Sequence, residues 1–477
     1  MNRTRQILKK SAAAVLCASL ILSGSSTAFA AGSYQETEKA ALNKLTDGIP
    51  ETWDTYLENY KKSAAGSKSN MTLKVEDTGR ALIGALMGGT DVSWLQSISL
   101  DSNISIKDGV EAIVSSVLLN DNKLCDFNVY MDLANMMEYI QIPELSDSYM
   151  KAPVSSDSEE NSEEAQQFLN TYMTTLSDLT SVLPDSKTLS TLLDRYGNII
   201  IDSFEEGSSV EESVSVDGIS EECTAYEGII SEKTAYTIVE KVLTTAKDDE
   251  EIKALFDQWS DDASNEENQY KDFQNLITDA LDDMNRDDEG STDNEAFSSK
   301  VWVNGDGKIV GRQFGITDGT DTTPVFTWKA PSEGEDSALL LELAADDSSF
   351  TFTGSGKTAD GLLNGDYILA VNGTETVDIN VENLETKPAK AGYYNGTFNI
   401  SFPAAETGES TEDDTDTSAT DMLAGFGAVI KLTSDADADT STLDLTVTTS
   451  GAALATLSIT GSYGEGVEIP DFASLDK

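Results

Sequence analysis

Apolar side chains recur at three- and four-residue spacing between residues 34 and 63. Trp53, Tyr56, Leu57 and Tyr60 form one stripe of this pattern. Such spacing places side chains on a single face of an α-helix. The pattern therefore predicts helical structure over residues 34–63, in two pieces.

A different period begins at Trp94. From there to Ile106 the even positions are mostly apolar, and the odd positions from Ser97 to Ser105 are Ser, Asp or Asn, which is typical of a strand with one wet face. Further strands are expected at residues 110–120, 124–132 and 136–142, and Pro143 ends the last of them. Strands of about ten residues exceed the usual five or six, so they predict a broad, curved antiparallel sheet.

Helical and extended patterns alternate in the middle of the chain. Phe168, Tyr172, Leu176, Leu179 and Leu183 share one helical face, and Pro184 stops that helix. A second helix is expected from Leu189 to Tyr196, and residues 208–230 return to a strand pattern. Three more amphipathic helices are expected at residues 236–243, 252–259 and 270–284.

Helix patterns stop near residue 295. Residues 301–310 have the pattern of a hairpin with Asn304-Gly305 in its turn, and alternating strands continue to the C-terminus. The expected fold class is α+β, with a large curved antiparallel β-sheet, helices packed on its concave face and a nearly all-β C-terminal part. Residues 31–290 would form an α+β domain, and residues 291–477 a β-rich region that continues the sheet or forms a second domain.

The first thirty residues have the three parts of a secretory signal peptide. Basic residues precede the apolar run of residues 12–22, and Ala28-Phe29-Ala30 supplies a cleavage site. The protein is therefore expected to be secreted or at the cell surface, with no transmembrane segment in the mature chain. Lipidation at Cys17 is the alternative, but Leu16 stands where a lipoprotein signal has a small residue.

Charge and composition exclude several functions. The formal net charge is −54, and a nucleic-acid partner would need basic patches that are missing here. Acidic runs at residues 155–160, 287–289 and 409–416 indicate solvated loops. The chain has no histidine, which removes Ser-His-Asp catalysis, Cys-His catalysis and histidine zinc sites.

Two cysteines remain after the signal peptide. Cys125 and Cys223 each begin an expected strand, and an oxidising compartment would allow a disulfide between them. Two buried free thiols are the alternative. The sequence nominates no catalytic, cofactor-binding or metal-binding residue, and it leaves the oligomeric state open.

Three short motifs suggest ligands and have simpler explanations. FTFTGSGKT, residues 350–358, ends like a phosphate-binding loop, but Thr351 replaces the first glycine and no helix pattern follows, so nucleotide binding is not expected. Phe350 and Phe352 are expected on one face of a strand, and Gly354-Ser355-Gly356 is expected to turn the chain. Asp435, Asp437 and Asp439 resemble a calcium loop, for which a hairpin turn is the better interpretation. Residues 304–307 indicate a hairpin turn more strongly than a cation site.

Tryptophans and carboxylates leave a hydrolase open. The five tryptophans could stack on sugars, but Trp94 and Trp302 in expected strands and Trp53 and Trp259 in expected helices suit core packing. The fifth is Trp328. Among many acids, Glu138 and Glu144 are the least arbitrary pair for glycoside hydrolysis, and neither is assigned as catalytic.

The order of elements resembles that of large secreted or lipid-anchored bacterial proteins of unknown function. The segments MEYIQIPELSDSYM and GDGKIVGRQF are parts of this order. More remotely, the chain resembles the LolA and LppX lipoprotein-carrier superfamily over residues 34–400. That resemblance implies a curved antiparallel sheet that holds an acyl chain, and hence a non-enzymatic protein whose partner is a lipid or an envelope component. A carboxylate-dependent glycan hydrolase and a structural or adhesive surface protein are the alternatives.

Overall fold

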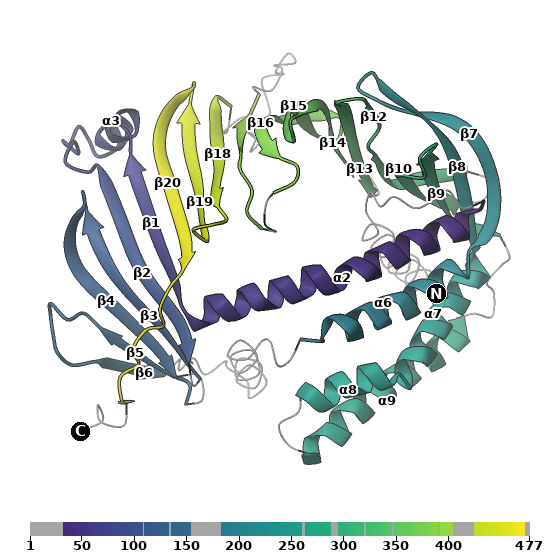
Figure 1. Cartoon of the computed structure of the whole chain (residues 1–477), viewed down its shortest axis with the longest axis horizontal. Helices are drawn as coiled ribbons and strands as arrows, with labels where there is room; N and C mark the ends of the chain where they lie inside the picture. The colour runs from purple at the N-terminus through teal and green to yellow at the C-terminus, as the bar shows by residue number, and fades with distance from the viewer. Residues whose placement is uncertain are drawn as a thin grey trace, which may run out of the picture. The chain divides into compact units, whose positions relative to one another are not determined.

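The structure is a computed structural model of the whole chain (Figure 1). It describes residues 32–472 apart from 108, 133–134, 154–182, 260–262, 288–293, 319–320, 346–347, 389, 391 and 404–423. Within these residues, 6 helices accompany a large antiparallel sheet of 20 strands that is not closed. The expected α+β class with a large antiparallel sheet is confirmed. The signal peptide, the helix at 168–183 and most of the acidic runs lie outside the described residues.

The helices and strands have the following bounds. The helices are α2 (Tyr34–Ala65), α3 (Asp77–Leu86), α6 (Ser186–Ile201), α7 (Glu232–Lys247), α8 (Glu250–Trp259) and α9 (Ala263–Asp287). The strands before residue 300 start with β1 (Ser67–Val75), β2 (Ser97–Lys107), β3 (Val110–Leu119), β4 (Asn122–Asp132), β5 (Met137–Gln141), β6 (Met150–Pro153), β7 (Glu205–Val216), β8 (Ile219–Ser231) and β9 (Glu295–Asn304). The remaining strands are β10 (Ile309–Asp318), β11 (Asp321–Lys329), β12 (Ser332–Glu333), β13 (Asp336–Ala345), β14 (Ser348–Ala359), β15 (Leu362–Val371), β16 (Thr374–Glu385), β17 (Gly396–Ser401), β18 (Phe426–Asp435), β19 (Thr440–Thr449) and β20 (Ala452–Tyr463).

The chain forms two compact units that interleave in sequence. The first unit comprises residues 1–54, 182–358 and 367–375, and the second comprises residues 55–181, 359–366 and 376–477. Each unit therefore takes chain from both sides of residue 291. The chain passes from one unit to the other within α2 and again in the segment from β14 to β16.

In the first unit, helices pack on a run of antiparallel strands. Strands β7 to β11 pair in chain order, and β13 and β14 follow. Helix α7 packs on β8 and β9, α6 packs on α7, and α9 packs on both α7 and α8 (Figure 1). The core between these layers contains Tyr34, Phe204, Ile230, Phe297 and Phe314, each at most 2% exposed.

A buried ion pair joins the first helix to the sheet of the first unit. Glu38 on α2 is 1% exposed and accepts a hydrogen bond from Arg312 on β10, which is 4% exposed. The Nε and Nη2 atoms of Arg312 and the hydroxyl of Tyr34 have no hydrogen-bond partner in the described residues. Burial raises the pKa of Tyr34 well above its usual value. The Glu38 carboxylate is thus the counter-charge that Arg312 requires in a buried environment.

Asp249 fixes the start of α8. Its Oδ1 accepts hydrogen bonds from the backbone N–H groups of Glu251 and Ile252, while Oδ2 accepts from Arg195 and Tyr196. Burial alone would raise the pKa of Asp249, but the hydrogen bonds from Arg195 and Tyr196 outweigh burial and lower the pKa to about 2. This carboxylate therefore caps one helix and ties it to α6.

In the second unit, the first strand of the chain pairs with the last. β1 pairs with β2 on one side and with the last strand, β20, on the other. The described pairings run from β16 through β17, β18, β19 and β20 to β1, and then through β2 to β6 (Figure 1). A core cluster of Val110, Ala112, Tyr130 and Tyr139 packs against Phe472 of the C-terminal segment. α3 packs on β20 so closely that a Cβ at Gly79 would lie 2.1 Å from the Leu454 carbonyl oxygen.

The first helix corrects one sequence prediction. Residues 34–63 were expected to form two helical pieces, but α2 is a single helix of 32 residues with Pro50 inside it. A proline cannot donate to the carbonyl four residues earlier, here that of Thr46. The Ser190 hydroxyl donates to the Thr46 carbonyl oxygen at 3.1 Å instead. A partner distant in sequence thus satisfies the group that proline leaves free.

Two strand predictions also require correction. Gly354-Ser355-Gly356 was expected to turn the chain, but these residues pair with β13 and the turn lies at Asp360-Gly361, where φ is 52° and 80°. Trp94 was expected in a strand, but it precedes β2 in a turn. The Asn120 side chain donates to the Trp94 carbonyl oxygen at 2.6 Å. Its Oδ1 accepts from the backbone N–H groups of Gln96 and Ser97, and these bonds hold the turn.

Candidate binding surface on the sheet of the second unit

β1 separates apolar from polar side chains by alternation. The last three odd positions are Met71, Leu73 and Val75, while the even positions are Lys68, Asn70, Thr72 and Lys74. Successive side chains of a strand point to opposite faces of the sheet. The strand therefore gives the sheet one apolar and one polar face along this length.

Neighbouring strands continue the apolar face in register. Leu73 aligns with Ile98 of β2 and with Leu457 of β20. The alignment extends from Leu457 to Leu445 of β19, Ile430 of β18 and Phe398 of β17. We call the following set the apolar face: Met71, Leu73, Ile98, Leu100, Val117, Phe398, Ile430, Leu432, Leu443, Leu445, Val447, Leu457 and Ile459.

Several side chains of the apolar face are accessible to solvent. Ile98 is 44% exposed, Met71 41%, Leu73 39%, Val447 38% and Leu443 37%. Single exposed apolar residues are ordinary in folded proteins, but contiguous exposed apolar surface marks a site of interaction. These five residues lie on β1, β2 and β19, and Leu457 and Ile459 of β20 align between those of β1 and β19, so the apolar side chains form such a surface.

The opposite face of the same strands is a network of hydroxyl groups. Thr442 bonds to Thr460 and Thr446 to Thr456, each at 2.9 Å, and Thr72 donates to Ser99 at 2.9 Å. Cross-strand Thr and Ser pairs of this kind stabilise a sheet through hydrogen bonds between neighbouring strands. The two faces therefore differ in chemistry, and the apolar face is the one suited to an apolar ligand.

A pocket lies at one end of the apolar face. It has a volume of about 280 Å³, and we call it the hydroxyl pocket. Ser67 and Ser69 of β1, Ser441 of β19 and Tyr463 of β20 line it, together with Tyr393. By register, the first four lie on the same face as Met71, Leu443 and Ile459. The face therefore changes from hydroxyl-bearing to apolar along each of the three strands.

One ion cluster borders the hydroxyl pocket. Asp439 accepts hydrogen bonds from the Lys390 ammonium and, at 3.2 Å, from the Tyr393 hydroxyl. The bond from Lys390 lowers the pKa of Asp439, and the bond to Asp439 raises the pKa of Lys390. The Lys390 ammonium also lies 4.6 Å from the centre of the Tyr393 ring. Both charges of the pair are therefore satisfied within the chain.

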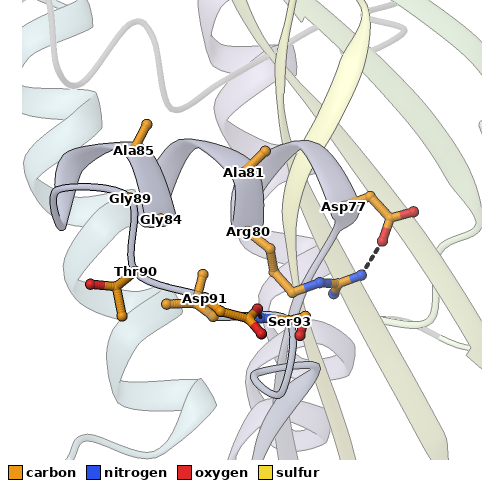
Figure 2. A pocket seen from close by; sticks show the side chains of 10 residues that line it. Asp77, Arg80, Ala81, Gly84, Ala85, Gly89, Thr90, Asp91 and Ser93 are labelled. Atoms are coloured by element: carbon orange, nitrogen blue, oxygen red, sulfur yellow. Dashed lines mark hydrogen bonds and ion pairs between the residues drawn. The ribbon is translucent and has the colours of Figure 1, made fainter.

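A second pocket, which we call the α3 pocket, lies between α3 and the segment that follows it (Figure 2). Its volume is about 440 Å³, and Asp77, Arg80 and Asp91 line it. Figure 2 shows the Arg80 guanidinium directed at Asp77, to which it is ion-paired. Trp94, next to the lining residue Ser93, is 56% exposed, and Leu86 at the end of α3 is 79% exposed.

The α3 pocket has only part of what glycoside hydrolysis needs. A general acid in such a reaction has a raised pKa. The backbone N–H and hydroxyl of Ser93 hydrogen-bond to Asp91 and lower its pKa. The other acid, Asp77, is 97% exposed at its side chain. The geometry therefore supplies two carboxylates beside an exposed tryptophan, without a desolvated acid among them.

The residues considered from sequence are distributed over both units. Cys125 on β4 is half-buried and Cys223 on β8 is buried, and both are free thiols. Burial raises the pKa of Cys223 to about 12. Glu144 accepts a hydrogen bond from the Asp126 backbone N–H at 2.9 Å, while Glu138 lies within β5 opposite Met131. The structure does not group Glu138 and Glu144 into a pocket among the described residues.

The remaining tryptophans belong mostly to packed or hydrogen-bonded positions. Trp302 is 5% exposed and donates to Glu212 at 2.8 Å. Trp328 packs against the core cluster of the first unit. Trp53 donates to the Pro184 carbonyl oxygen at 2.8 Å. The side chain of Trp259 lies outside the described residues. The interpretation as core residues is therefore confirmed for Trp302 and is wrong for Trp94.

The three ligand-like motifs are all part of strands and turns. Lys357 lies in β14 and forms an ion pair of 3.2 Å with Glu335. Asp435 Oδ1 accepts from the backbone N–H groups of Asp437 and Ala438, each at 3.0 Å, and so forms the turn between β18 and β19. Asn304 Oδ1 likewise accepts from the turn before β10, so both hairpin interpretations are confirmed. The described part of the chain contains no group of three His, Cys, Asp or Glu residues placed to hold a metal ion.

Sequence reasoning missed the strand that organises the surface. Residues 67–75 were not assigned, although their alternation of Ser, Met, Leu and Val with Lys, Asn and Thr is the signal of a strand. The hydroxyl pocket is assembled from segments near residues 67, 393, 441 and 463, which only the pairing of β1 with β20 brings together.

No helix in the described ranges has both the length and the apolar character needed to cross a bilayer. Searches against models of protein families, curated proteins and solved structures find no match to this chain.

Proposed function

We propose that this protein is a non-enzymatic, extracytoplasmic binding protein that holds the alkyl chain of a lipid-like ligand on its apolar face. The observation that carries the proposal is the exposure of five large apolar side chains on one face of β1, β2 and β19, from 37% for Leu443 to 44% for Ile98. Contact with an alkyl chain removes this surface from water, which is favourable in proportion to the area covered. The signal-like first thirty residues support a location outside the cytoplasm.

The dimensions of the face suit a single alkyl chain. From Met71 to Val75 the strand advances four residues, which is about 14 Å at the rise of an antiparallel strand. One leaflet of a bilayer has a hydrocarbon thickness of about 15 Å, half of the whole core. A membrane-derived acyl chain is therefore about as long as the apolar part of β1.

The proposal is tested by titrating the intact chain with N-phenyl-1-naphthylamine, an uncharged dye whose fluorescence rises in apolar surroundings. We expect saturable binding, together with a co-purifying lipid-like compound in native mass spectrometry. A chain that contains no such compound and also gives no saturable dye binding would overturn the proposal.

A glycan hydrolase has less support. The exposed Trp94 beside the α3 pocket is what such an enzyme would use to stack on a sugar. However, the pKa of Asp91 is shifted down, away from the value that a general acid needs. We therefore favour binding over hydrolysis.

A further inference from the structure

The hydroxyl pocket and the apolar face form one continuous surface. On β1, Ser67 and Ser69 precede Met71, Leu73 and Val75 at alternate positions of the same strand. On β20 the order is Tyr463, Gly461, Ile459 and Leu457, and on β19 it is Ser441, Leu443 and Leu445. On all three strands the side chains of this face change from polar to apolar at aligned residues, namely Met71, Ile459 and Leu443.

The pocket offers hydroxyl groups that are free to bind a ligand. Among the described residues, the hydroxyls of Ser67, Ser69 and Tyr463 make no hydrogen bond within the chain. A hydroxyl group both donates and accepts hydrogen bonds. A lining of this kind matches a ligand group that also donates and accepts, such as another set of hydroxyls.

The charges around the pocket disfavour a charged ligand group. Asp439, which would attract a cation, is already bound by Lys390, and the Tyr393 ring faces the same ammonium. An anion is repelled by the negative charge of the whole molecule, whose formal net charge is −54. Lys68 also lines the pocket, where its methylene groups lie against Gly464, so an anion is the charged ligand that the test must exclude.

We propose that the hydroxyl pocket takes the uncharged, hydroxyl-bearing head group of an amphiphile, a glycerol or a single sugar, whose alkyl chain lies on the apolar face. This inference rests on the proposed function, because it places the head of the ligand whose chain the apolar face holds. The pocket volume of about 280 Å³ accommodates a small head group. The head fixes the end of the ligand, and the strands direct its chain towards Val75.

The test compares three amphiphiles with the same ten-carbon chain on the intact protein. Decyl glucoside has an uncharged sugar head, decanoate is an anion, and decyltrimethylammonium is a cation. Titration calorimetry below the micellar concentrations measures each Kd. We expect decyl glucoside to bind at least about tenfold more tightly than either charged compound, since its hydroxyls replace water at several pocket groups.

Two conservative variants assign the preference to the pocket. Tyr463→Phe and Ser69→Ala each remove one hydroxyl, and each should weaken decyl glucoside binding about two- to tenfold. Binding of decanoate should change less than twofold in both variants. Ser97→Ala removes a hydroxyl on the opposite face of the neighbouring strand and is the matched control, expected to leave all three affinities unchanged.

The outcomes separate the head-group inference from the proposed function. If no amphiphile binds, both are wrong. If all three bind equally, or a charged compound binds best, while a charge placed on the apolar face abolishes binding, the function stands and the head-group inference is overturned. Equal affinity for decyl glucoside in the wild type and in both pocket variants would also overturn it.

Discussion

Replacing Ile98 by aspartate would place a carboxylate in the middle of the apolar face. Ile98 aligns with Leu73 and Leu119 on the two flanking strands and is 44% exposed. Since about half of the side chain is already in water, the lost burial costs about 1 kcal/mol of folding free energy. The variant should therefore remain folded.

The effect of Ile98→Asp on ligand binding should be much larger. An alkyl chain that covers the carboxylate must displace its water, and a polar group buried without a hydrogen bond costs about 1–3 kcal/mol. The contact of one or two methylenes is also lost, at about 0.8 kcal/mol each. The sum is about 2–4 kcal/mol, so the Kd should rise at least about 30-fold.

Ser97→Asp is the matched control for this variant. It adds the same charge at the preceding residue, but on the polar face, where Ser97 aligns with Lys74. Both variants are titrated with N-phenyl-1-naphthylamine, and circular dichroism checks that both are folded. We expect Ser97→Asp to bind as the wild type does. Equal affinity of the two folded variants for the dye would refute the assignment of binding to the apolar face.

Three further variants test what holds each unit together. Glu38→Gln leaves Arg312 buried and charged without its counter-charge, and should lower the free energy of unfolding by about 3–5 kcal/mol in urea titrations. Gly79→Ala forces a Cβ against a backbone carbonyl oxygen and should cost about 1–3 kcal/mol in the same assay. Asp249→Asn should cost about 2 kcal/mol at pH 7, because the pKa of Asp249 is lowered from 3.8 to about 2. This difference should be complete above about pH 4 and should vanish as the pH falls through 2, since the depressed pKa stabilises only the ionised form.

Each of these expectations has an outcome that contradicts it. Gly48→Ala is the control for the glycine variant, because its Cβ would meet nothing within 4 Å in the middle of α2. It should be neutral or stabilising. A Glu38→Gln protein as stable as the wild type would mean that the ion pair with Arg312 contributes nothing. A stability difference for Asp249→Asn that does not change between pH 5 and pH 2 would refute the low pKa of that carboxyl group.

Local patterns predicted much of the fold, because strands and hairpins depend on neighbouring residues. The alternation at residues 98–106 and the Asn304-Gly305 turn both led to the elements that form. Pairing between distant segments could not be predicted in this way. Ser67 aligns with Tyr463, and nothing local to either residue indicates the other.

The same limit explains what was missed at the candidate site. Helix α2 continues through Pro50 because Ser190, far along the chain, satisfies the Thr46 carbonyl. Trp94 is exposed because the Asn120 side chain holds the turn before β2. The hydroxyl pocket needs the alignment of Ser67 with Tyr463 and of Ser441 with Gly461, so its residues had no common signal in sequence.

Binding of an alkyl-glucoside series is the most direct measurement of the proposed function. If the apolar face holds the alkyl chain, each added methylene should contribute about 0.8 kcal/mol and lower the Kd about fourfold between hexyl and decyl glucoside. The heat capacity change on binding should be negative and should grow with chain length. A Kd that does not depend on chain length would contradict binding on the apolar face.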